Sequence, residues 1–147
     1  MKKLVVKIAS ALLLVASFTS CCNDDDSSKT SSIIGKWNFS TQKISTPNGF
    51  LLSEGPYEGN EAGCNADYLE FSEDHLAVAG DYGENCVLEL IPGTYNRDEK
   101  DLTLSFGPMN DTDYRILVAN ETTLVLENRY QQDGTTRVVE VKYLKAA

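Results

Sequence analysis

The stretch Ile33-Ile34-Gly35-Lys36-Trp37-Asn38-Phe39 opens the part of the chain that has the composition of a folded domain. It contains the only tryptophan and directly follows the polar segment 23–32, which has no apolar residue. Between residues 35 and 44, Trp37, Phe39 and Thr41 alternate with polar neighbours. An alternation with period two is typical of a β-strand with one buried face. The stretch therefore predicts the first strand of a β-domain.

The rest of the chain repeats this pattern in short segments separated by turn residues. No apolar period of 3.6 residues persists for three turns, so no long amphipathic helix is predicted. Pro92-Gly93 suggests a bulge or a bend within one of the segments, and Asp133-Gly134 is a strong hairpin signal. The alternating segments after the first are 67–72, 76–82, 86–95, 101–106, 113–119, 123–131 and 135–144.

These segments predict an all-β fold, an eight-stranded up-and-down antiparallel β-barrel. Short connections favour antiparallel pairing between consecutive strands. Closing the sheet removes two exposed edges and covers its apolar face; a β-sandwich is the alternative. The residues expected to point inward are bulky enough to fill most of an eight-stranded barrel: Trp37, Phe39, Phe71, Leu88, Leu90, Leu104, Phe106, Tyr114, Ile116, Leu126, Tyr130 and Tyr143.

Residues 45–65 interrupt the strand pattern. They contain two prolines and four glycines, which predicts a long loop. Because Phe50, Leu51, Leu52 and Tyr57 lie within it, part of the loop is expected either to fold over an apolar opening or to pack on the rim as a simple crossover.

Residues 1–20 have a basic start, a short apolar run and small residues before Cys21, which is typical of a secretory signal peptide. Ser20-Cys21 resembles the lipobox of bacterial lipoproteins, which implies cleavage before Cys21 and lipid attachment, such as palmitate, to that residue. An ordinary signal peptide is the alternative, and the role of Cys22 stays open. Residues 21–32 then form a polar tether, and 33–145 the domain. The expected location is the outer membrane, facing the periplasm or the cell surface. Asp24-Asp25-Asp26 either resembles a surface-export signal or keeps the tether extended.

The charge excludes nucleic acid as a partner. Removing the leader takes away three lysines and no acid, which changes the formal charge from −9 to −12. Nucleic-acid binding depends on neutralising phosphates, so such a chain is repelled. His75 is the only histidine and lies in a predicted turn, and motifs for hydrolases, zinc proteases and phosphate binding are absent from the sequence. We therefore expect no metal, no cofactor and no enzymatic activity.

Gly35-Lys36-Trp37 at the first of eight strands resembles the lipocalin-like proteins of the calycin group. Tyr95 after the Gly93 bend and a Cys64–Cys86 pair are similar to a bacterial branch of that group. An oxidising compartment also favours this disulfide, two separate thiols being the alternative. Two features depart from the family pattern. Thr112-Asp113-Tyr114 matches its second motif one strand early, and the arginine that caps the family's barrel has no clear equivalent.

The resemblance implies a small apolar ligand at the barrel mouth. The alternative is a non-catalytic module that binds a protein partner, such as an inhibitor or an accessory subunit of an outer-membrane assembly. Trp37 is expected to plug the closed end against Val139 and Val141, or else to contact the ligand. The candidates for the barrel end or the ligand site are Gly35, Trp37, Phe39, Tyr95, Phe106, Tyr114, Tyr130 and Tyr143.

Overall fold

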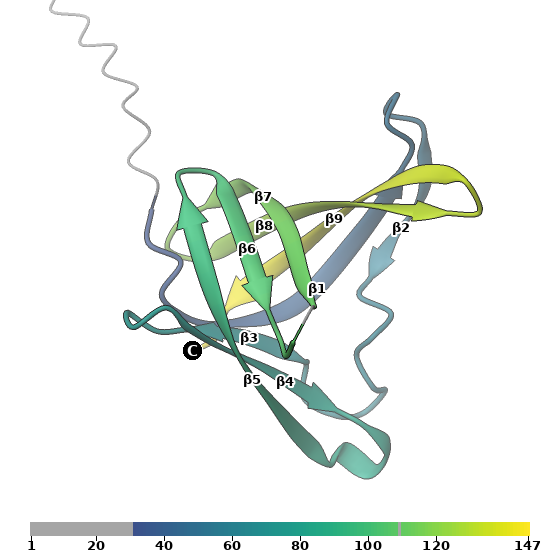
Figure 1. Cartoon of the computed structure of the whole chain (residues 1–147). Coiled ribbons are helices and arrows are strands. Elements are labelled where there is room, and N and C mark those ends of the chain that lie inside the picture. The colour runs from purple at the N-terminus through teal and green to yellow at the C-terminus, as the bar shows by residue number, and fades with distance from the viewer. Residues whose placement is uncertain (1–30, 109) are drawn as a thin grey trace, which may run out of the picture.

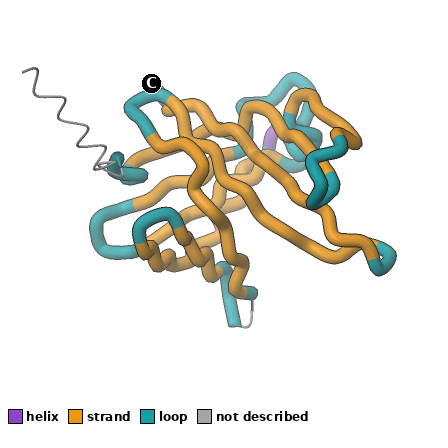
Figure 2. The backbone as a smooth tube through the Cα atoms, turned by 90° about the horizontal axis from the view of Figure 1, so that it is seen from above, coloured by secondary structure: helices purple, strands orange, loops and turns teal. Residues whose placement is uncertain are grey.

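The computed structural model describes residues 31–108 and 110–147. The predicted leader, Cys21 and nearly all of the tether lie outside these residues. Strand makes up most of the described backbone, and the one helical element there is the short 3-10 turn η1 (Glu84–Cys86) (Figure 2). The strands are β1 (Gly35–Ser45), β2 (Leu51–Pro56), β3 (Tyr68–Phe71), β4 (Leu76–Tyr82), β5 (Leu88–Asp98), β6 (Asp101–Ser105), β7 (Asp111–Ala119), β8 (Thr123–Gln132) and β9 (Thr135–Lys145).

Eight of these strands form a closed antiparallel barrel, as the sequence predicts. β1 and then β3 to β9 follow one another around the sheet, and β9 pairs back onto β1 to close it (Figure 1). The Asp133-Gly134 hairpin is confirmed: both residues have positive φ, and Gln132 pairs with Thr135 across the turn. A two-residue turn with positive φ at both positions matches the twist of the strands that it joins.

β2 corrects the prediction of a structureless loop over 45–65. It pairs with the second half of β1, from Thr41 to Ser45, while β3 pairs with the first half, from Gly35 to Asn38. Its apolar residues Leu51 and Leu52 stay exposed. This strand is therefore held by backbone hydrogen bonds to β1 and not by burial of one face. For that reason its sequence shows no alternating hydrophobic pattern.

Strand bends and extensions beyond the barrel decide which residues are buried. In β4 the buried residues are Ala77 and Gly80, while Leu76 is exposed. In β7 a register shift between Ile116 and Val118 turns Val118 outward. Three residues expected to point inward are exposed, on strands whose hairpins extend away from the barrel (Figure 1): Leu88, Leu90 and Tyr130.

Gly93 is explained by a close approach and not by a bulge. The β4–β5 register runs through Pro92 and Gly93 without a shift. A Cβ atom at Gly93 would meet the backbone oxygen of Ser105 and the ring of Phe106. Glycine is the residue that lets two strands come this close, because it has no side chain.

The core lies inside the barrel. It is a continuous cluster of aliphatic and aromatic side chains contributed by all eight barrel strands and by the segment before β1. Its fully buried large members are Trp37, Tyr143, Phe71, Ile33, Leu102, Leu104, Leu124 and Leu126. Of the twelve residues expected to point inward, nine belong to this core or pack against it, and the other three are exposed.

Candidate functional site

The two ends of the barrel differ, and the chain direction assigns each loop to an end. One end carries residues 31–34, the β3–β4, β5–β6 and β7–β8 turns, and the C-terminus; we call it the closed end. The opposite end carries the β1–β2, β4–β5, β6–β7 and β8–β9 connections and the loop 57–67; we call it the open end.

Trp37 plugs the closed end, as predicted, but with different partners. Its side chain is 1% exposed, and the indole N–H donates to the backbone oxygen of Ile33 at 2.7 Å. Its register partner on β9 is Lys145, whereas Val139 and Val141 pair further along, with Ile44 and Gln42. The acceptor is therefore supplied by the segment before β1 and not by β9.

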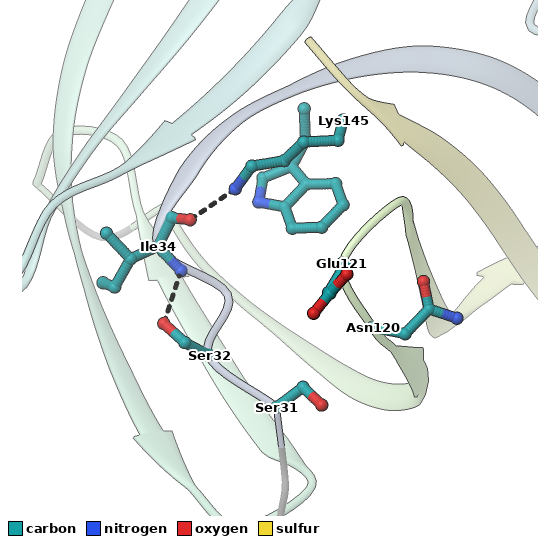
Figure 3. A pocket seen from close by; sticks show the side chains of 7 residues that line it. Ser31, Ser32, Ile34, Asn120, Glu121 and Lys145 are labelled. Atoms are coloured by element: carbon teal, nitrogen blue, oxygen red, sulfur yellow. Dashed lines mark hydrogen bonds between the residues drawn. The ribbon is translucent and has the colours of Figure 1, made fainter. Parts of the chain in front are cut away.

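The sequence has no clear equivalent of the arginine that caps the barrel in the family. Here the side chain of Lys145 covers Trp37 at the closed end. Its Nζ lies 4.2 Å from the centre of the Trp37 ring and donates to the Ile34 backbone oxygen at 2.5 Å (Figure 3). A cation over an indole face is attracted by the ring's quadrupole. A Cβ atom at Gly35, which has a φ of +115°, would meet Lys145 Nζ, so Gly35 makes room for this cap.

A depression of about 700 Å³ lies beside this plug. Serine, asparagine, glutamate and lysine side chains supply much of its wall, and the lining residues are Ser31, Ser32, Ile34, Trp37, Asn120, Glu121 and Lys145 (Figure 3). Ligand sites for apolar molecules are mostly apolar and enclosed. This depression is open to solvent and not enclosed, and its size alone does not make it the ligand site.

Tyr95 also belongs to the closed end and has a structural role there. Its ring meets Phe71 edge-on at 5.1 Å, and its hydroxyl donates to the Ser72 backbone oxygen at 2.8 Å. The exposed His75 ring lies 5.3 Å away. Among residues 31–108 and 110–147 there is no group of three or more His, Cys, Asp or Glu placed to hold a metal ion.

The open half of the barrel contains an aromatic cluster. Phe39 on β1 lies between two tyrosine rings, with centroids 4.3 Å from Tyr57 and 4.6 Å from Tyr143. Tyr143 on β9 is 2% exposed, and Tyr114 on β7 packs against the same core. We call Phe39, Tyr57, Tyr114 and Tyr143 the tyrosine cluster. It brings three of the predicted site residues together and adds Tyr57.

The three phenols of the tyrosine cluster are neutral. Burial raises the pKa of each, and it raises that of Tyr143 well above the ordinary value. The phenols of Tyr57 and Tyr114 add to the rise at Tyr143, while the carboxylates of Asp67 and Asp81 add to it at Tyr57. At neutral pH all three hydroxyls are therefore available as hydrogen-bond donors.

Two residues that the sequence did not single out join the loop 57–67 to the barrel. Asn60 donates to the Phe39 backbone oxygen at 3.2 Å and accepts from the Asp67 backbone N–H at 2.9 Å. The buried Asp67 carboxylate accepts from the Tyr82 N–H at 2.8 Å, and burial raises its pKa. Polar residues in a loop carry no periodic signal, so only the folded chain shows this network.

The Cys64–Cys86 disulfide is present, with the two Cα atoms 5.2 Å apart. It ties the loop 57–67 to η1, so it also restrains the loop that carries Tyr57. Of the remaining predicted site residues, Phe106 packs against the core beside Gly93 at the end of β6, and Tyr130 is 39% exposed on β8. Tyr130 is therefore separate from the tyrosine cluster.

The profile of the lipocalin-like domain family matches residues 33–126. The chain belongs to this family. The matched part begins at the plug and ends within β8, and the structure shows that the rest of β8 and β9 complete the lipocalin-like barrel. Eight-stranded barrels of this kind have an interior wide enough for side chains or for one small ligand.

Solved structures support the same fold. A protein of Bacteroides eggerthii aligns with a TM-score of 0.53 at 10% identity, over 78% of this chain and 100% of that one. A lipocalin-like protein of Bacteroides uniformis aligns with a TM-score of 0.54 at 11% identity, over 77% and 97% of the two chains. Lobster apocrustacyanin A1 aligns with a TM-score of 0.53 at 14% identity, over 78% of this chain and 61% of that one. A comparison with curated proteins found no match.

Proposed function

We propose that this lipocalin-like protein binds a small apolar ligand in the open half of its barrel and performs no catalysis. The observation that carries the proposal is the tyrosine cluster, whose aromatic rings from β1, β7, β9 and the loop 57–67 pack on or within the core. Aromatic walls with a few polar groups are typical of ligand pockets. The opposite end is filled by Trp37 and Ile33, so the open end is the side from which a ligand enters.

Apolar side chains are exposed on the hairpins that extend from the open end. Phe50, Leu51 and Leu52 at the β1–β2 hairpin are 70%, 47% and 42% exposed. Val87 and Leu88, where β5 begins at the same end, are 66% and 40% exposed. Exposed apolar side chains at a barrel mouth offer an approach surface for molecules that avoid water. The same side chains are the one observation that favours the second candidate function, docking of a protein partner.

The binding site can be tested with a solvent-sensitive apolar dye. Dye emission should saturate with one site per chain, and Phe39→Ala should weaken binding roughly 2- to 10-fold, the size expected for loss of an aromatic contact. Leu144→Ala is the matched control, because Leu144 is an exposed apolar residue near the closed end. The proposal would be contradicted if Phe39→Ala and Leu144→Ala lost dye affinity equally, or if the wild type showed no saturable dye binding.

The proposal includes anchoring to the outer membrane through a lipid on Cys21, with residues 21–32 as the tether. It is supported by the leader sequence and by the position of Ser31, the first described residue, which lines the depression at the closed end (Figure 3). In the described part of the chain, no helix has the length and apolar character needed to cross a membrane.

Cys21→Ala should leave the uncleaved precursor and abolish incorporation of a labelled fatty acid. The reason is that the thiol of Cys21 is the proposed acceptor. Electrophoresis after metabolic labelling measures both effects, with Cys22→Ala as the matched control. If labelling survives in Cys21→Ala and disappears in Cys22→Ala, the lipid acceptor is Cys22 and not Cys21.

A further inference from the structure

The first half of β5 lies at an open edge of the sheet. β4 pairs with β5 from Leu88 to Thr94, whereas β6 pairs with it only from Thr94 to Asp98. The β4–β5 hairpin therefore extends past the end of β6 (Figure 1), and in the described part of the chain no strand pairs with residues 88–93 on that side. An edge strand exposes backbone N–H and C=O groups to which a further strand can be added.

Hydrogen bonds at both ends of this segment show which way its backbone groups point. The Tyr95 N–H donates to the His75 carbonyl oxygen at 2.9 Å, and the Val87 carbonyl oxygen accepts from the Gly83 N–H at 3.0 Å. Val87 and Tyr95 are both odd-numbered, and the β4–β5 register between them has no shift. Because the direction alternates along an antiparallel strand, the odd-numbered residues point toward β4 and the even-numbered residues toward the open edge.

Three residues therefore turn their backbone groups to the open edge: Leu88, Leu90 and Pro92. Leu88 and Leu90 each offer an N–H and a C=O, while Pro92 offers only its C=O because its nitrogen carries no hydrogen. A short antiparallel strand laid along this edge can therefore donate to three carbonyl oxygens and accept from two N–H groups.

The side chains beside the open edge are apolar, and the charges near them are negative. Leu88 and Leu90 lie on the face opposite to that of the buried Tyr95 and are 40% and 57% exposed. Ile91, on the other face, is also exposed. Residues 76–94 contain no lysine, arginine or histidine and three carboxylates, those of Asp81, Glu84 and Glu89.

This charge selects among the strands that could pair with the edge. A second copy of the same hairpin would bring two sets of carboxylates together without a cation, and the chain as a whole has a formal charge of −9. Like charges on paired strands destabilise the pair, whereas opposite charges stabilise it. The occupant that fits is therefore an extended segment with apolar side chains on one face and basic side chains on the other.

We propose that the open edge of β5 binds an extended segment of another protein, in which apolar residues alternate with lysine or arginine, as an additional antiparallel strand. Antiparallel addition continues the pairing of β4, β5 and β6. Apolar residues of the segment lie opposite Leu88 and Leu90 and make the backbone hydrogen bonds, and a basic residue lies opposite Glu89. The Cys64–Cys86 bridge ties η1, which precedes β5, to the loop 57–67, so the edge is held in place before binding.

The test uses a short fluorescent peptide in which leucine and lysine alternate, and its binding to the full chain is followed by fluorescence anisotropy. This parent peptide should bind saturably. N-methylation of its leucines removes the N–H groups that face the edge, so it should weaken binding roughly 10-fold or more, the effect of losing at least two net hydrogen bonds. N-methylation of its lysines alters only the far edge of the peptide, so binding should be retained.

Leu90→Lys should weaken binding of the parent peptide roughly 10-fold, because it removes an apolar contact and adds a positive charge beside a basic peptide. Leu144→Lys is the matched control with the same change of charge. Leu144 is also an exposed leucine, but its strand is paired on both sides, with β1 and with β8. Leu144→Lys should leave the affinity for the peptide unchanged.

Four results would overturn parts of the proposal. Equal binding of the parent and the leucine-methylated peptide would show attraction by charge alone and overturn strand addition. Loss of binding only in the lysine-methylated peptide would overturn the antiparallel arrangement. Equal effects of Leu90→Lys and Leu144→Lys, or no saturable binding, would overturn the site. A wild-type dimer in sedimentation that Leu90→Lys dissociates would assign the edge to a second copy of the chain.

Discussion

Trp37→Ala should lower the free energy of unfolding by about 3–5 kcal/mol, the usual cost of truncating a buried tryptophan. The indole is 1% exposed, closes the barrel end and anchors Ile33 through a 2.7 Å hydrogen bond. Its loss leaves a cavity and also removes the ring beneath Lys145. Because single domains are stable by only about 5–15 kcal/mol, the variant should be close to unfolding at growth temperature.

Thermal melts followed by circular dichroism measure this loss. For a domain of this size, the midpoint should fall by roughly 10–20 °C. Trp37→Phe is the matched control, since it keeps most of the apolar volume and removes the N–H donor. The fall in its melting midpoint should be clearly smaller than that of Trp37→Ala. A shift of only a few degrees in Trp37→Ala would show that the plug contributes little, and attention would return to Trp37 as a ligand contact.

Removal of the Cys64–Cys86 bridge should have the next largest effect. In the chain-entropy model, a disulfide closing a loop of this length stabilises the folded state by about 3 kcal/mol. The bridge spans a sequence separation of 22 residues and joins loop 57–67 to η1. The double variant Cys64→Ala with Cys86→Ala should therefore melt about 10 °C lower than the oxidised wild type.

Reduction of the wild type is the matched control, because it breaks the same bond without changing the sequence. The reduced protein should melt near the double variant. Ligand affinity should also fall in both, since the loop that carries Tyr57 loses one restraint. Equal melting temperatures for the reduced and oxidised wild type would show that backbone contacts alone hold this loop.

Much of the barrel could be predicted because its turns and strands leave local signals. Asp133-Gly134 predicts its hairpin through positive φ at both positions, and β6 shows clean alternation around Leu102 and Leu104. β2 could not be predicted in this way. Its residues are exposed and its stability comes from pairing with β1, which depends on the partner's position and not on side-chain pattern.

The candidate site could be predicted only in part. Phe39, Tyr114 and Tyr143 follow from strand alternation, since each occupies an inward position of a regular segment. Tyr57 comes from a loop, and its place beside Phe39 depends on hydrogen bonds made by Asn60. Such contacts join residues far apart in the chain, so no regular spacing in the sequence predicts them.

The sequence by itself determined the period of the strands and the turns between most of them, and it favoured the pairing of two cysteines that the structure shows. An alternation with period two indicates that successive side chains point to opposite faces of a strand, but it does not indicate which face is buried. Only the closed barrel decided that Ala77 is buried while Leu76, Leu88 and Leu90 are exposed. It also decided that Lys145 caps Trp37 and that Phe39 packs against both Tyr57 and Tyr143. The physical reason is that burial and hydrogen-bond partners depend on curvature, register shifts and strand ends, which are fixed when distant segments close on one another.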